Sequence, residues 1–251
     1  MHSEHRFLLD EIKKAGPPRT GALENDSYGG SGHPYYRVSV PDRRRLARAW
    51  VSAHKAMAPT EVLAVVDSLF QGESHEEKTL AALLLAYHPK ARAAATTAMF
   101  DAWLGHLNGW VEVDSLCQNV FTPKEMLADW PAWSGLIGRL GRDGDINRRR
   151  AALVLLTRPV SVTDDTRFTD LAFDGIERMK AERDILITKA VSWLLRSMAG
   201  RHGALVRAYL EANLASLPAI AVRETRVKLA TGVKSGKPRR PDRHARLSDP
   251  S

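Results

Sequence analysis

Three features of the sequence predict an all-α fold built from stacked helix pairs. From Pro41 onward, apolar residues recur at helical spacing almost throughout, and the breaks fall at Gly, Pro, Asp or Asn. Charged residues recur early in successive expected helices at nearly regular intervals. Only the segment YYRVSV at residues 35–40 alternates as a strand does. Because no other segment offers it a partner, we expect an extended loop there.

The regular interval indicates a repeat of about 35 to 45 residues, which is typical of a HEAT-like helical-repeat solenoid. Such an array curves, and its inner helices present equivalent positions along one concave face. Five of the six aligned positions are Lys or Arg, so we expect a basic concave groove with one carboxylate near its middle. The aligned residues, separated by 34, 36, 36, 39 and 37 positions by subtraction of their numbers, are Arg44, Lys78, Asp114, Arg150, Lys189 and Arg226.

The N-terminal part differs from the repeats. Residues 4–14 form an amphipathic pattern that predicts a short helix, and the segment from Gly16 to Pro34 is rich in turn-forming residues. Ser74 and Glu77 form a capping box that predicts the start of one helix. The helices expected after the N-terminal part span residues 41–55, 59–70, 75–87, 90–105, 110–121, 123–129, 131–141, 146–157, 166–179, 184–199, 203–214 and 218–230.

These elements predict one helical-repeat domain over residues 1–231. Residues 1–40 form its N-terminal helix and Gly-rich loop, and residues 41–231 form the repeats. Residues 232–251 contain the polar, basic run KSGKPRRPDRHARLSDPS, which we expect to be disordered.

Composition narrows the class of protein. The net charge of +8 favours a polyanionic partner, nucleic acid before an acidic membrane surface, although part of the excess lies in the C-terminal tail. No apolar run approaches the roughly 18 residues of a membrane span, and no signal peptide is evident, so we expect a cytoplasmic protein without a membrane partner. Cys117 is the single cysteine, which excludes an intramolecular disulfide and a multi-thiolate metal site. The histidines lack ligand spacing, so we expect no metal and no cofactor.

The helix expected at residues 110–121 carries the most informative pair. Trp110 and Asp114 lie one turn apart on one face, and Asp is a poor residue for a helix interior. The simplest explanation is that this edge lines an open groove. Structural alternatives stay open, because Trp110 and Trp193 could be core aromatics and Asp114 could bridge to Arg150. Cys117, one turn further on, is expected to be a small buried residue.

Several stretches together resemble the AlkD-like DNA alkylation repair family, the HEAT-like-repeat DNA glycosylases. Trp110-x-x-x-Asp114, Arg150 in RRRAALVLL and Trp193 in KAVSWLLR fall at matching phases of three consecutive repeats. The resemblance covers roughly residues 20–230 and includes the entry segment SYGGSGHPYYRVSVPDRRR. One departure is Arg37, where family members usually carry Gly.

The resemblance implies excision of N3- and N7-alkylated purines from double-stranded DNA, by a monomer and without base flipping. Its implied catalytic residues are Asp114, Trp110, Trp193 and Arg150. The open alternatives are a self-resistance glycosylase for bulky natural-product adducts, a non-catalytic DNA-binding repeat module and a protein-interaction scaffold. The residues expected to contact DNA are Tyr28, Arg43, Arg44, Lys78, Arg148, Arg149, Lys189 and Arg226.

Overall fold

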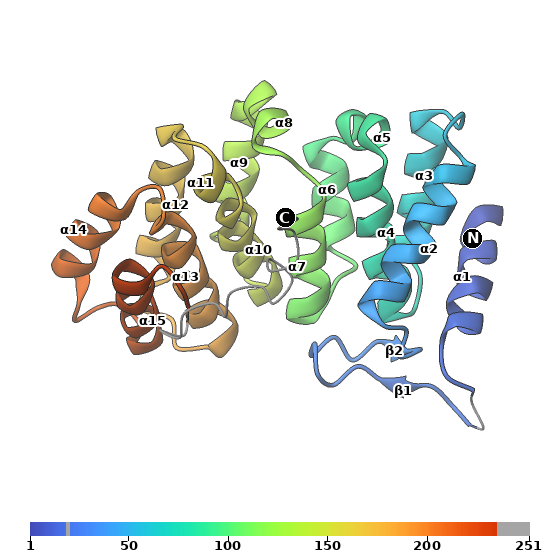
Figure 1. The fold of residues 1–251 in the computed structure, drawn as a ribbon, viewed down its shortest axis with the longest axis horizontal. Coiled ribbons are helices and arrows are strands. Elements are labelled where there is room, and N and C mark those ends of the chain that lie inside the picture. Colours follow the sequence, from blue (N-terminus) through green and yellow to red (C-terminus); the bar gives the residue numbers. More distant parts are fainter. Residues whose placement is uncertain (19–20, 235–251) are drawn as a thin grey trace, which may run out of the picture.

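The computed structural model describes residues 1–18 and 21–234, and the regular secondary structure within them is almost entirely helical (Figure 1). Most of the basic tail expected to be disordered, residues 235–251, lies outside the described residues. The elements in order are α1 (Ser3–Ala15), β1 (Glu24–Asn25), β2 (Pro34–Tyr35), α2 (Val40–Ala53), α3 (Pro59–Phe70), α4 (His75–Tyr87), α5 (Pro89–Ala94), α6 (Thr97–Leu104), α7 (Gly109–Asn119), α8 (Pro123–Ala128), α9 (Trp130–Leu140), α10 (Ile146–Thr157), α11 (Pro159–Val162), α12 (Thr166–Met179), α13 (Ile185–Met198), α14 (Gly203–Asn213) and α15 (Ala219–Thr231).

The helices form two layers of an arch (Figure 1). The helices α2, α4, α7, α10, α13 and α15 pack successively against one another, while α3, α9, α12 and α14 cover them from the other side. Each of the six aligned charged positions falls on one helix of the first layer. The prediction of an all-α helical-repeat fold is therefore confirmed. None of the helices within residues 1–18 and 21–234 is long and apolar enough to cross a lipid bilayer.

Helix starts follow local chemistry. The Ser74 hydroxyl accepts from the Glu77 N–H, and the Glu77 carboxylate accepts from the Ser74 N–H, so the capping box that begins α4 is confirmed. The helix expected at 90–105 is two helices, because the Thr96 side chain caps a fresh start by accepting from the Met99 N–H. The short helix α11 was not expected.

The extended-loop prediction for residues 35–40 needs a correction. Pro34–Tyr35 pairs in antiparallel register with Glu24–Asn25, so the Gly-rich segment does supply a strand partner. Arg37 just beyond it has φ of 60°, a left-handed conformation that Gly adopts without strain. Arg37 therefore stands in place of the family's usual Gly at a position whose backbone conformation favours Gly.

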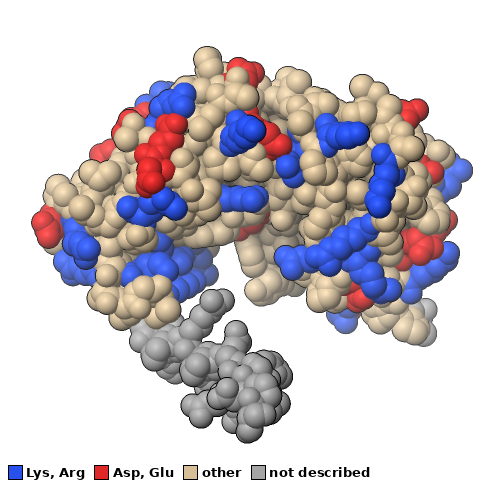
Figure 2. Space-filling model, turned by 45° about the horizontal axis from the view of Figure 1, so that its top comes forward, with Lys and Arg blue, Asp and Glu red and all other residues tan. Residues whose placement is uncertain are grey.

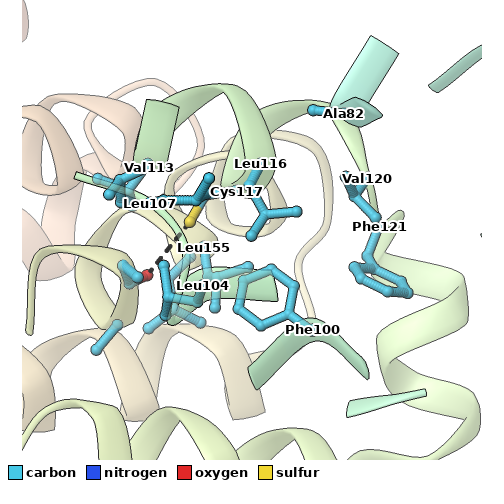
Figure 3. Packing of buried hydrophobic residues seen from close by; sticks show 14 of the residues in the cluster. Ala82, Phe100, Leu104, Leu107, Val113, Leu116, Cys117, Val120, Phe121 and Leu155 are labelled. Atoms are coloured by element: carbon cyan, nitrogen blue, oxygen red, sulfur yellow. Dashed lines mark hydrogen bonds between the residues drawn. The ribbon is translucent and has the colours of Figure 1, made fainter. Parts of the chain in front are cut away.

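The core runs between the two layers without interruption along the arch. Around the middle, side chains of α6, α7 and α10 interdigitate, and Figure 3 shows Leu116 and Cys117 of α7 beside Phe100 and Leu155. Cys117 is 4% exposed, and its Sγ lies 4.0 Å from the Ala151 carbonyl oxygen. Burial raises the pKa of this thiol well above its usual value, so it serves as a small core residue rather than a nucleophile.

Two basic residues expected to contact DNA lie in the interior instead. Lys78 is 4% exposed, and its ammonium donates to the carbonyls of Phe70 and Gly72 at 2.9 and 2.7 Å, where α3 ends. Arg43 is 5% exposed, and its guanidinium donates to Thr79. Both charges already satisfy buried polar groups, so their burial disfavours the prediction that Arg43 and Lys78 contact DNA.

We expect Lys78→Met to reduce the free energy of unfolding by about 1–3 kcal/mol, because it leaves two carbonyls at the end of α3 without their donor. Urea denaturation followed by circular dichroism measures this loss. Arg44→Met, which alters an exposed side chain on a neighbouring helix, serves as the control and should change the value by less than about 0.5 kcal/mol. Equal effects of the two substitutions would contradict the structural role of Lys78.

Candidate functional site

An ion pair between α7 and α10 forms the centre of the site. The Arg150 guanidinium donates from Nε to Asp114 Oδ1 at 2.9 Å and from Nη2 to Oδ2 at 2.8 Å. Its Nη1 donates to the Leu186 carbonyl at the start of α13 at 2.6 Å. Arg150 thus connects three successive inner helices and fixes the position of the carboxylate.

The Asp114 carboxyl group is held at the edge of the solvent. Its side chain is 14% exposed, whereas that of Arg150 is 6% exposed. Burial raises the pKa of Asp114, and the hydrogen bonds and charge of Arg150 oppose this rise only in part. The carboxylate is therefore more basic than an ordinary aspartate and still reachable from the groove.

A cavity of about 540 Å³ brings the predicted catalytic residues together. Asp114, Trp110, Trp193 and Arg150 all line it, and so does Tyr28. The two indoles come from α7 and α13, on either side of the helix that supplies Arg150. Both are partly exposed, so neither is a fully buried core aromatic, although Trp193 also packs against the core.

The Gly-rich loop fixes the Trp110 indole, which forms part of the lining of the cavity. The Trp110 indole Nε1 donates to the Tyr28 carbonyl at 3.1 Å, and the two rings meet edge to face with centroids 5.3 Å apart. Tyr28 itself is 80% exposed. It therefore presents an aromatic surface at the cavity, and its backbone is anchored by Trp110.

The lining of the cavity also includes a second charge pair that the sequence did not point to. The Ser192 hydroxyl donates to Glu224 Oε2 at 2.7 Å, and Arg196 Nε lies 3.2 Å from the same oxygen. Arg196 follows Trp193 by three residues on α13, so helical spacing could have identified it. Glu224 comes from α15 with no local signal in the sequence.

The remaining basic candidates have different environments. Lys189 is exposed and lines the cavity, whereas Arg44 and Arg226 are exposed outside it. Arg148 and Arg149 are occupied: the first pairs with Asp101 and Asp143, and the second donates to Glu182 at 3.0 Å.

Arg148 and Arg149 therefore tie together loops and helices between repeats, and their contact with DNA stays a prediction. Figure 2 shows that Lys and Arg nevertheless gather on both sides of the hollow in the molecule. Within residues 1–18 and 21–234, no cluster of His, Cys, Asp and Glu is placed to hold a metal ion.

One protein-family model matches most of the chain, and a solved structure shares its fold. The family model described as DNA alkylation repair enzyme matches residues 10–229. A solved structure described as a predicted DNA alkylation repair enzyme from Enterococcus faecalis is similar with a TM-score of 0.64 and 16% sequence identity, covering 84% of this chain and 99% of that chain. At this identity the likeness shows the fold alone. No curated protein matches the chain. Since the family match spans most of its length, the chain belongs to the DNA alkylation repair enzymes.

Proposed function

We propose that the protein is a DNA glycosylase that excises cationic N3- and N7-alkylated purines from double-stranded DNA. The observation that carries this proposal is the placement of Asp114 and the two indoles of Trp110 and Trp193 around one open cavity. A non-catalytic scaffold does not require a partly exposed carboxylate beside two indole rings. Partial burial of the Asp114 carboxylate costs desolvation free energy. This cost is explained if the charge acts on a substrate.

The chemistry of the substrate explains the residue types. A purine alkylated at N3 or N7 is already cationic and leaves without a general acid, so the barrier lies in the positive charge that develops on the sugar. A fixed carboxylate such as Asp114 stabilises that charge and can orient the attacking water. Indole faces attract both the cationic base and the charged sugar.

Arg150 has a supporting role in this proposal. Its two hydrogen bonds hold both carboxylate oxygens of Asp114, so the group cannot rotate away from the groove. Lys189 at the cavity, with Arg44 and Arg226 farther along the inner helices, supplies charge for the phosphates without reading the sequence. The lesion is proposed to react while it remains near the base stack.

The size of the cavity favours a second candidate, excision of bulky adducts in self-resistance to a DNA-alkylating natural product. A volume of about 540 Å³ lies within the range of sites that hold drug-sized ligands. The polar pair of Arg196 and Glu224 in its lining could meet substituents that a methylated purine lacks. Release of a bulky N7 adduct compared with release of 7-methylguanine separates the two candidates.

We expect Asp114→Asn to lower the single-turnover rate of 7-methylguanine release by at least about 100-fold, because the variant lacks the charge that opposes the sugar cation. Asp101→Asn is the matched control, since this carboxylate also pairs with an arginine between repeats but lies outside the cavity. DNA affinity should persist in both variants. Similar rates for Asp114→Asn and the unchanged protein would remove Asp114 from the mechanism.

The rate should also depend on pH through Asp114. The ionised form is the active one, and its pKa is raised above the usual value of about 3.9. Release should therefore be constant at neutral pH and should fall as pH drops through the raised pKa, at a higher pH than an ordinary aspartate would require. Spontaneous base loss without protein is subtracted at each pH. A rate that stays flat into the range of an unshifted aspartate would contradict this assignment.

Binding to duplex DNA should weaken steeply with salt because phosphate contacts release counterions. Lys189→Gln should reduce the slope of log Kd against log salt by about one. Lys78→Met, which removes a buried charge, should leave that slope unchanged. Fluorescence anisotropy with a labelled duplex at several salt concentrations measures both, and a smaller slope for Lys78→Met would reinstate Lys78 as a DNA contact.

A further inference from the structure

The loop at residues 26–33 is internally braced by one buried carboxylate. Asp26 is 6% exposed, and its oxygens accept from the Gly29 N–H at 2.9 Å and the Ser31 hydroxyl at 2.9 Å. The Asp26 N–H donates to the His33 carbonyl at 2.8 Å and closes the loop. The loop therefore has a defined shape despite its glycines.

This braced loop is attached to the start of α7. The Trp110 N–H donates to the Gly29 carbonyl at 2.9 Å, and the Trp110 indole donates to the neighbouring Tyr28 carbonyl. Gly109 has φ of 67°, and a Cβ there would collide with the backbone of Gly29 and Gly30. Two consecutive carbonyls of the loop thus set both the backbone and the ring of Trp110.

A second buried carboxylate, Glu112, holds His33 at the end of the loop. Its side chain is 1% exposed and accepts from His33 Nδ1 at 3.0 Å, His75 Nδ1 at 3.1 Å and the Asn108 N–H at 3.1 Å. Burial raises the pKa of Glu112, but the hydrogen bonds from His33 and His75 outweigh it and lower the pKa overall. Glu112 stays ionised and keeps His33 in place.

Glu112 and Asp114 stand on opposite sides of α7, because two residues correspond to about 200° of helical rotation. We propose that Glu112 is a positioning residue that acts through His33 and the braced loop to hold the Trp110 indole against the cavity. This inference rests on the proposed function only for its kinetic consequence. The geometry of Trp110 can be tested without activity.

Glu76 provides a matched control in the same region. It is fully buried and accepts from the Tyr36 and Val38 N–H groups at 2.9 and 3.1 Å. It therefore anchors the chain after the loop, and its hydrogen bonds do not reach Trp110. Glu76→Gln should cost stability as Glu112→Gln does, without changing the indole.

The first test is spectroscopic. In protein carrying ¹⁵N-labelled tryptophan, the Trp110 indole resonance is the one that disappears in Trp110→Phe. Glu112→Gln should shift or broaden this resonance, because the Tyr28 carbonyl that accepts its hydrogen bond moves. Glu76→Gln should leave it in place. An unchanged resonance in Glu112→Gln, or equal shifts in both variants, would overturn the proposal whether or not the protein releases bases.

The second test is a double-mutant cycle on single-turnover release of 7-methylguanine. Glu112→Gln should lower the rate by about tenfold with duplex affinity changed less than about twofold, since the loss is one of orientation. In a Trp110→Ala background the same change should cost less than about twofold. Independent, multiplicative losses would overturn the positioning role. Absence of release by the unchanged protein would instead refute the proposed function.

Discussion

The bidentate pairing of Asp114 with Arg150 is the constraint on which the rest of the site depends. Removing two charges from water is costly, and the cost is offset here by good geometry and by the third hydrogen bond, to the Leu186 carbonyl. Arg150 is the more buried partner, so its charge is committed to the carboxylate and the backbone. Asp114 is left oriented, ionisable and open on one side. The indoles and the surrounding cations take their positions from the same three helices.

Much of the fold followed from the sequence because its determinants are local. Helical spacing and the box of Ser74 and Glu77 set where helices begin, and the repeat placed equivalent residues on successive inner helices. Matching positions on the helices of successive repeats place Asp114 and Trp193 at the same cavity. The hairpin and the division between α5 and α6 were missed, because two-residue pairing and a single Thr cap leave almost no periodic signal.

The exposure of charged side chains could not be predicted from position alone. Lys78 and Lys189 occupy equivalent places in the repeat, yet one reaches back to carbonyls at the end of a helix while the other faces the cavity. The contact between His33 and Glu112 joins residues 79 positions apart, and no spacing rule connects them.

The layered arrangement has a consequence for how the enzyme fails. Helices of a repeat array contact mainly their neighbours, so the last repeats can loosen while the others stay folded. Trp193 and Arg196 belong to α13, which packs against α15, the last helix within the described residues. Fraying at this terminus would detach one wall of the cavity while most of the helical content persisted. Mild heat would then disrupt the cavity while most of the circular-dichroism signal of the helices remained.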